Sequence, residues 1–378
     1  MSDNVVIIGS GFAARQLVKH IRKLDAHLPV TLIAGDSADE YNKPELSHVI
    51  SRGQHADDLT RQTGAAFAQA FNLTLHAHTQ VTSLDPQRKT VSGGGQTWAY
   101  SKLVLATGAR ARILPVPGGE DMITLNSQAE FRRYETRLFD ARRILVVGGG
   151  LIGCELAMDL CRAGKQVTLV DKAPAILPAL LPVHLSAPLH CALTKAGVTV
   201  LTGQQLHCIE PHADGLRISL EKGIQFSVDD VISATGLQPE TTLARQAGLA
   251  VNQGIQVNQK LQTSDPAIFA LGDCAEINGQ CLPYLQPGQL SALTLAQNLT
   301  GQDVTLSLPP ALVKVKTPSL PLQLAGQPLR EDLHWKIAVT TNGMAAQGYD
   351  NDETLCAFVA SEERIPESFG WLRQLAGA

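Results

Sequence analysis

Two glycine-rich stretches, each followed by an acidic side chain, have the residue types and spacing that could support chemistry. The first reads Gly9-x-Gly11-x-x-Ala14 and follows an apolar run. Gly9 permits a tight turn, Gly11 lets the backbone approach a pyrophosphate, and Ala14 keeps the following helix close to its sheet. Asp36 follows a second apolar run and could accept hydrogen bonds from ribose hydroxyls. This pattern predicts a dinucleotide site.

The second stretch, Gly148-x-Gly150-x-x-Gly153, carries the glycine fingerprint in full. Asp171 ends the apolar run that follows it. A carboxylate at this place suits the free 2′-hydroxyl of NAD and repels the 2′-phosphate of NADP. The neighbouring Lys172 weakens this preference. The sequence therefore predicts a second dinucleotide site that prefers NADH.

The elements that must position these residues are strands followed by helices. Each glycine turn sits between an apolar run and a helical pattern, and a second apolar run follows, which predicts two β-turn-α-β units. Further buried runs end in small-residue turns at Thr107-Gly108, Thr235-Gly236 and Gly272-Asp273. We expect an α/β fold with two Rossmann-like domains and a small C-terminal α+β domain. The expected domains are a discontinuous first domain (1–112 and 241–311), a second domain (113–240) and a C-terminal domain (312–378).

Composition limits the partners and the compartment. Hydrophobic residues make up 44% of the chain and charged residues 17%, and the formal net charge is −4. This balance argues against a nucleic-acid partner, and no apolar stretch is long enough to cross a membrane. The seven cysteines contain no Cys-x-x-Cys pair, and no metal-ligand cluster stands out. We expect a cytoplasmic protein without an export signal, a disulfide framework or a metal site.

Taken together, these motifs resemble the two-dinucleotide flavoprotein oxidoreductases, the superfamily of the pyridine-nucleotide disulfide reductases. The stretches that carry the resemblance are the two glycine motifs, Ala106-Thr107-Gly108-Ala109-Arg110, Cys154-Glu155, Ala234-Thr235-Gly236 and Leu271-Gly272-Asp273-Cys274. The disulfide branch has Cys-x4-Cys in the segment that here reads Tyr41-Asn42-Lys43-Pro44-Glu45-Leu46-Ser47. Without a cysteine there, thiol–disulfide exchange is not expected. This segment and residues 315–322 look instead like the reductases of small iron proteins, especially the rubredoxin reductases.

The resemblance implies FAD in the first site and NADH in the second. It implies that Lys43 approaches the flavin N5 and pairs with Glu155, and that Lys316 also contacts the flavin. Asp273 is expected at the ribityl chain or the flavin phosphate, and the backbone of Val81 at the adenine. The other motif residues expected to line the cofactors are Thr107, Gly108, Arg110, Gly236 and Gly272. His48 stands where several ferredoxin-type relatives have lysine, which departs from the pattern.

The resemblance also implies an electron acceptor, a rubredoxin-domain protein such as a flavorubredoxin, and a role in nitric oxide reduction. Because rubredoxin-type modules are usually acidic, a basic docking surface is expected. The densest cationic run comprises Arg132, Arg133, Arg137, Arg142 and Arg143, for which a solvated helix face is the alternative. Two other functions stay open: a flavoenzyme that reduces another ferredoxin-like or small-molecule acceptor, and a non-catalytic FAD- or NAD-binding scaffold.

Overall fold

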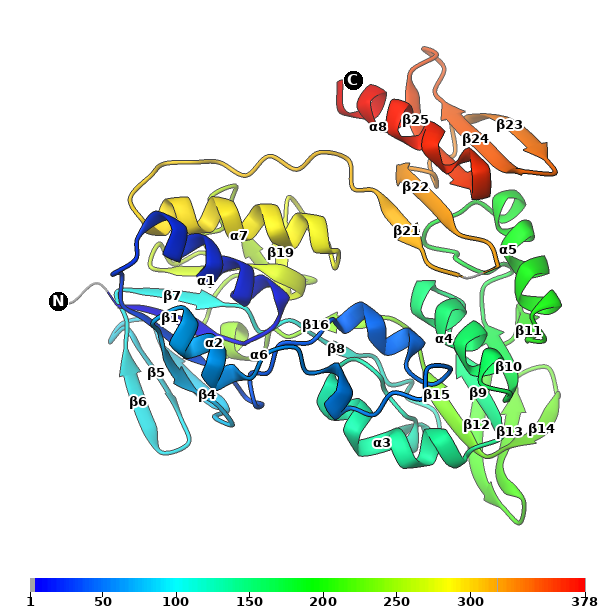
Figure 1. The fold of residues 1–378 in the computed structure, drawn as a ribbon, viewed down its shortest axis with the longest axis horizontal. Helices are drawn as coiled ribbons and strands as arrows, with labels where there is room; N and C mark the ends of the chain where they lie inside the picture. The colour runs from blue at the N-terminus through cyan, green and yellow to red at the C-terminus, as the bar shows by residue number, and fades with distance from the viewer. Residues whose placement is uncertain (1–3, 318, 378) are drawn as a thin grey trace. The chain divides into compact units, whose positions relative to one another are not determined.

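The chain divides into two compact units in the computed structural model, which describes residues 4–317 and 319–377 (Figure 1). The first unit comprises Met1–Tyr41, Thr60–Arg110 and Leu237–Leu308, and the second comprises Asn42–Leu59, Ala111–Gly236 and Pro309–Ala378. Residues 42–59 thus group with the second unit, whereas the predicted boundaries include them in the first domain. The division into three domains stays a prediction.

A five-stranded parallel sheet forms the centre of the first unit, in the order β18-β7-β1-β2-β3. Its strands are Ile268–Ala270, Lys102–Leu105, Val5–Ile8, Val30–Ile33 and Thr74–His76. Every residue of β1 and β2 is buried, as expected for parallel strands covered on both faces. Helix α1 (Phe12–Leu24) lies beside α7 (Leu285–Leu299) (Figure 1). It buries Ala14, Leu17, Val18 and Ile21, which recur at helical spacing.

Smaller elements complete the first unit. Strands β4 (Val81–Asp85), β5 (Thr90–Gly93) and β6 (Gln96–Ala99) form an antiparallel sheet, and Leu84 and Val91 contribute to the core of the unit. The remaining elements are α2 (Gly64–Ala70), β8 (Ala109–Ala111), β16 (Leu237–Pro239), α6 (Thr242–Gln246), β17 (Ile255–Val257), η4 (Gly272–Cys274), β19 (Ala275–Ile277) and β20 (Gln280–Cys281).

The second unit contains its own parallel sheet, in the order β11-β10-β9-β15. These strands are Thr199–Thr202, Gln166–Asp171, Arg143–Val147 and Asp230–Ser233. An antiparallel sheet of β12 (Leu206–His212), β13 (Gly215–Leu220) and β14 (Gln225–Val228) shares a hydrophobic core with it. The helices are α3 (Gln128–Asp140), α4 (Leu151–Arg162), α5 (Val183–Lys195) and the short turns η1 (Lys43–His48), η2 (Asp57–Leu59) and η3 (Gly119–Asp121).

The C-terminal part of the second unit is a five-stranded antiparallel sheet, in the order β21-β22-β25-β24-β23. Its strands are Val313–Val315, Leu322–Gly326, Leu355–Ser361, Gly343–Tyr349 and His334–Thr340. After η5 (Glu362–Glu367), helix α8 (Ser368–Gly377) packs against β25, where Trp371 contacts Phe358. The predicted fold class, α/β with two Rossmann-type sheets and a C-terminal α+β part, is confirmed.

Candidate functional site

The first glycine turn connects the end of β1 to α1. Gly9 has φ +109°, and a Cβ on it would lie 2.1 Å from the carbonyl oxygen of Ala106, so only glycine fits. Gly11 is the N-cap of α1, makes no side-chain cap hydrogen bond and would place a Cβ in open space. No acidic residue occupies the first turn of this helix. Because these features leave first-turn amides and the helix dipole available to an anion, the turn fits a pyrophosphate.

Asp36 lies beside this turn. Its Oδ1 accepts hydrogen bonds from the hydroxyl of Ser10 at 2.9 Å and from the amide of Ala38 at 3.0 Å. Ser10 is the residue between the two glycines, so the carboxylate is fixed directly at the turn. This arrangement can present a carboxylate oxygen to the hydroxyls of a ribose.

The second glycine turn repeats this arrangement between β9 and α4. A Cβ on Gly148 (φ +110°) would lie 2.4 Å from the carbonyl oxygen of Ala234, and one on Gly153 would lie 1.8 Å from that of Gly148. Gly150 is the N-cap of α4 and has no side-chain cap. The turn therefore requires its glycines for close packing and leaves amides for a second pyrophosphate.

Asp171 closes the second turn in the same manner. Its Oδ2 accepts a hydrogen bond from the amide of Gly149 at 2.5 Å, and its Oδ1 accepts one from the amide of Ala173 at 2.7 Å. Gly149 occupies the position that Ser10 has in the first turn. In both turns, a helix N-terminus without a side-chain cap therefore lies beside a carboxylate that is held by hydrogen bonds.

Other predicted residues of the first unit lie at turns or near its core. Thr107 donates its hydroxyl hydrogen bond to the carbonyl oxygen of Glu240 at 2.8 Å. Arg110 is exposed and forms an ion pair with the carboxylate of Glu240. Val81 begins β4 and is buried. The predicted glycines Gly108, Gly236 and Gly272 all have positive φ. Of these, Gly236 belongs to the second unit. Asp273 lies in η4, which follows β18.

A buried carboxylate, Glu155, joins two distant segments of the second unit. This side chain of α4 is 6% exposed. Its Oε2 accepts a hydrogen bond from the hydroxyl of Ser47 at 2.8 Å, and its Oε1 accepts one from the backbone amide of Lys316 at 2.9 Å. Lys43 begins η1, the turn that contains Ser47. The structure thus brings the segments of Lys43 and Lys316 to one helix, while the direct pairing of Lys43 with Glu155 stays a prediction. Pro318, in the 315–322 motif, lies outside the described residues.

Asp159, one helical turn after Glu155, is a further buried carboxylate that the sequence motifs did not identify. It is 2% exposed, and its Oδ2 accepts hydrogen bonds from the amides of Ile50 and Ser51 at 3.0 and 3.1 Å. Its Oδ1 accepts a further one from the hydroxyl of Ser51. The i, i+4 spacing of two acids in a helix whose other residues are apolar except for the final Arg162 was the signal available in the sequence.

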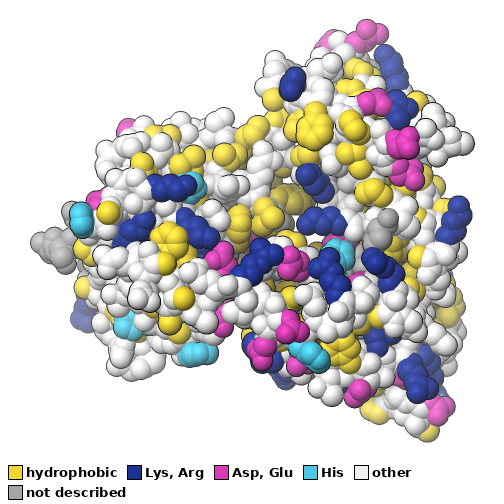
Figure 2. Space-filling model, in the orientation of Figure 1, with side chains coloured by type: hydrophobic (Ala, Val, Ile, Leu, Met, Phe, Trp, Pro, Cys, Tyr) yellow, Lys and Arg dark blue, Asp and Glu magenta, His cyan; other side chains and the backbone are white. Residues whose placement is uncertain are grey.

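The cationic run predicted as a docking surface is largely engaged in ion pairs within the second unit. Arg132 pairs with Asp57 at 2.7 Å, Arg137 with Asp230 at 2.6 Å, and Arg143 with Asp229 at 2.6 Å. On the face in Figure 2, cationic and acidic side chains are interspersed. These pairs support the alternative of a solvated, ion-paired surface and weaken the docking hypothesis.

Thiol chemistry finds no support among the described cysteines near these turns. Burial raises the pKa of Cys154, beside Glu155, to about 12, and burial also raises the pKa of Cys274. A thiol with a raised pKa is a poor nucleophile because the thiolate is scarce. Within residues 4–317 and 319–377, no cluster of three potential metal ligands occurs, and no helix is long and apolar enough to cross a membrane.

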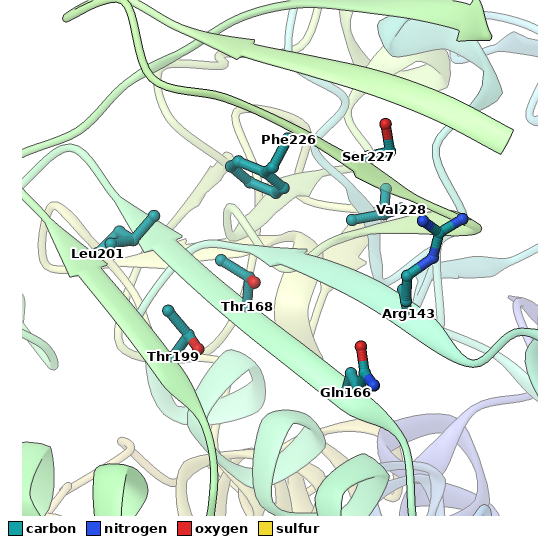
Figure 3. A pocket seen from close by; sticks show the side chains of 8 residues that line it. All are labelled: Arg143, Gln166, Thr168, Thr199, Leu201, Phe226, Ser227 and Val228. Carbon is teal, nitrogen blue, oxygen red and sulfur yellow. The ribbon is translucent and has the colours of Figure 1, made fainter. Parts of the chain in front are cut away.

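A cavity of about 310 Å³ lies elsewhere in the second unit (Figure 3). Arg143, Gln166 and Thr199, the first residues of β9, β10 and β11, line it together with residues of β14. Because dinucleotides bind at the carboxyl ends of parallel strands, this cavity at the opposite ends is not the coenzyme site.

Comparison with known proteins agrees with this geometry. Residues 3–298 match the pyridine nucleotide-disulphide oxidoreductase family, and residues 305–375 match a rubredoxin binding C-terminal domain. The chain is 58% identical, over the full length of both proteins, to the nitric oxide reductase FlRd-NAD(+) reductase of Escherichia coli O127:H6.

Two solved structures share the fold over nearly the whole chain. Putidaredoxin reductase, solved in a covalent complex with putidaredoxin, has a TM-score of 0.88 at 28% identity, covering 99% of this chain and 93% of that one. A ferredoxin reductase from Rhodopseudomonas palustris has a TM-score of 0.89 at 26% identity, covering 97% and 93%. These matches confirm the predicted oxidoreductase class, with FAD and NADH as its dinucleotides. The chain belongs to the pyridine nucleotide-disulphide oxidoreductase family.

Proposed function

We propose that this chain transfers electrons from NADH, through FAD, to the iron centre of a rubredoxin-type protein. The pair of uncapped helix N-termini, at Gly11 and Gly150, each beside a fixed carboxylate, carries the proposal. Two dinucleotides in one chain suit a hydride donor and a hydride acceptor. FAD, when bound, accepts hydride from the nicotinamide and releases the electrons singly. In the balanced reaction, NADH and two iron(III) centres give NAD⁺, a proton and two iron(II) centres.

The roles of the site residues follow from this proposal. Asp36 holds the adenosine ribose of FAD, and Asp171 holds that of NADH. Lys43 and Lys316 supply positive charge at the flavin, and Glu155 holds their segments in place. The remaining residues proposed to line the cofactors are Gly9, Ala14, Val81, Thr107, Gly108, Arg110, Gly148, Gly153, Gly236, Gly272 and Asp273.

The acceptor is proposed from the C-terminal part of the chain. Residues 305–375 match a domain described as rubredoxin binding, and the relative from Escherichia coli is named for nitric oxide reduction. We therefore propose a flavorubredoxin as the partner and nitric oxide reduction as the process served. A cytoplasmic location is proposed from the cysteine pattern.

Thiol–disulfide exchange is not part of the proposal, despite the name of the family. The stretch from Tyr41 to Ser47 contains no cysteine, and burial raises the pKa of both Cys154 and Cys274. A redox-active pair would need an accessible thiolate next to the flavin.

Anaerobic stopped-flow absorbance tests the proposed function. The FAD-loaded protein is mixed with NADH and then with a rubredoxin or flavorubredoxin. We expect rapid bleaching of the flavin band, then its return together with reduction of the iron centre. Bleaching without iron reduction would overturn the proposed acceptor. In a separate aerobic assay without the iron protein, fast NADH oxidation would favour a small-molecule acceptor. Failure of NADH to bleach the flavin would overturn the enzymatic function and leave a binding scaffold.

The docking hypothesis has a separate test. Arg133 lies in the predicted basic run, and its guanidinium stacks over the ring of Tyr134 at 5.2 Å. If an acidic partner docks there, Arg133→Glu should slow iron reduction and weaken its dependence on salt, while NADH reduces the flavin as before. Unchanged iron reduction and salt dependence would remove this surface from consideration.

A further inference from the structure

The segment from Lys43 to Ser51 is attached to α4 at two points. Ser47 donates to Glu155, and Ile50 and Ser51 donate to Asp159. We propose that Asp159 is a positioning residue, which fixes the orientation of this segment and so sets where Lys43 stands at the flavin. This inference rests on the proposed function, in which Lys43 supplies charge at the flavin.

The spacing of the two attachments gives them a directional effect. Glu155 and Asp159 are four residues apart on α4, which separates them by about 6 Å along the helix axis. Their hydroxyl partners, Ser47 and Ser51, are also four residues apart. One attachment would let the segment pivot about a single hydrogen bond, whereas two attachments fix its direction along the helix.

The buried carboxylate of Asp159 accepts several strong hydrogen bonds. Three donors reach one carboxylate that is 2% exposed, and two of them are backbone amides of consecutive residues. Hydrogen bonds to an ionised acceptor are stronger than those between neutral groups, and their loss in a buried site leaves amides unsatisfied. Asp159 therefore fixes the backbone of the segment itself, and not merely one side chain.

Lys43 depends on that backbone because it begins η1, only a few residues before Ser47. Pro44 follows it directly and restricts the local backbone, so Lys43 moves with the turn. A shift at Ile50 and Ser51 is consequently transmitted to the position of the lysine ammonium group. Asp159 acts through this segment and is not itself placed at the reacting atoms.

The test compares Asp159→Asn with Asp230→Asn in the FAD-loaded protein. Asp230 is a matched control because it is 4% exposed, accepts hydrogen bonds from Arg137 and makes no described contact with residues 43–51. Three experiments are made: amide hydrogen exchange at Ile50 and Ser51, a dithionite titration that gives the midpoint potential of FAD, and steady-state kinetics that give kcat and KM for NADH.

For Asp159→Asn we expect amide exchange at Ile50 and Ser51 to rise by about 10- to 100-fold. The potential of FAD should fall, because the cation that stabilises the reduced flavin is less well placed, and kcat should fall while KM for NADH stays unchanged. Asp159→Glu should recover part of both the potential and kcat. Asp230→Asn should lower stability without these changes.

The inference is overturned if Asp159→Asn changes exchange but leaves the potential and kcat like those of Asp230→Asn. It is overturned equally if exchange at Ile50 and Ser51 does not rise. Failure of the proposed function is seen separately, because it appears in the wild-type protein as a flavin that NADH cannot bleach or iron that is not reduced. The dithionite titration needs neither NADH nor the iron protein.

Discussion

The hydroxyl of Ser47 donates a hydrogen bond of 2.8 Å to the buried carboxylate of Glu155, although 108 positions separate the two residues in the sequence. The second oxygen of this carboxylate accepts from the amide of Lys316, 161 positions away on the other side. Glu155 therefore connects three segments of the chain through its hydrogen bonds, and its pairing with Lys43 stays a prediction.

The Ser47→Ala variant should have a lower free energy of unfolding and a slower reduction of the flavin by NADH. It leaves one oxygen of Glu155 without its hydroxyl donor in a buried site, which costs about 1–3 kcal/mol of unfolding free energy. Urea unfolding and stopped-flow reduction by NADH measure the two effects. Ser186→Ala is the control, because Ser186 is equally buried but donates to Val183 within its own helix. Equal reduction rates in both variants would contradict the organising role of Ser47.

Two glycines of the second turn should respond differently to alanine. Gly148→Ala combines a positive φ with a clash at the carbonyl of Ala234, so we expect a loss of about 2–5 kcal/mol of unfolding free energy. Gly150→Ala meets no atom within 4 Å and should fold with nearly unchanged stability. Its methyl group should instead hinder the pyrophosphate and raise KM for NADH. Thermal unfolding and steady-state kinetics separate the two cases, and normal NADH kinetics in Gly150→Ala would argue against coenzyme binding there.

Coenzyme choice should depend on Asp171. Replacing it with alanine removes the carboxylate that repels a 2′-phosphate and should narrow the preference for NADH over NADPH by about 10- to 100-fold in kcat/KM. Asp36→Ala alters the corresponding carboxylate of the first turn and should reduce FAD content without changing the preference. If Asp36→Ala changed the preference and Asp171→Ala did not, the assignment of the two sites would have to be reversed.

Acid should destabilise the first unit through Glu276, a buried residue of β19. The amide of Gly254, 2.9 Å from its Oε2, lowers the pKa of Glu276, and the side chain of Asn252 adds to this effect. Because the folded-state pKa is lowered, the stabilisation is present above the ordinary glutamate pKa of about 4.3 and is lost as pH falls through the lowered value.

Unfolding in urea at a series of pH values tests the predicted contribution of Glu276 to acid destabilisation. Glu276→Gln should have a lower free energy of unfolding than the wild type at neutral pH. Below about pH 4.3 its free energy of unfolding should fall less steeply than that of the wild type. Glu221→Gln, a change at an exposed position, should follow the wild-type curve. A Glu276→Gln curve parallel to the wild-type curve throughout the acid range would disprove the contribution of this carboxylate.

The sequence predicted those features that local geometry imposes. Gly9 and Gly148 were identifiable because a tight strand-to-helix turn excludes other residues. Asp171 was identifiable because it ends the next strand, and Asp36 because it follows shortly after the next strand. The partners of Glu155 and Asp159 were not identifiable, because hydrogen bonds across more than 100 positions depend on the folded arrangement. The arginines near Asp57, Asp229 and Asp230 illustrate the same limit: their charge is evident in the sequence, but their ion pairs are not.

The assignment of residues 42–59 to the second unit has a consequence for synthesis on the ribosome. The segment emerges early, yet α4, to which it is attached, is made about 100 residues later. The central sheet of the first unit likewise waits for β18 at Ile268–Ala270 before its order is complete. Neither unit can finish folding as a contiguous stretch of nascent chain, so both should reach their native contacts late in translation, and fragments cut at a unit boundary should expose unpaired strand edges.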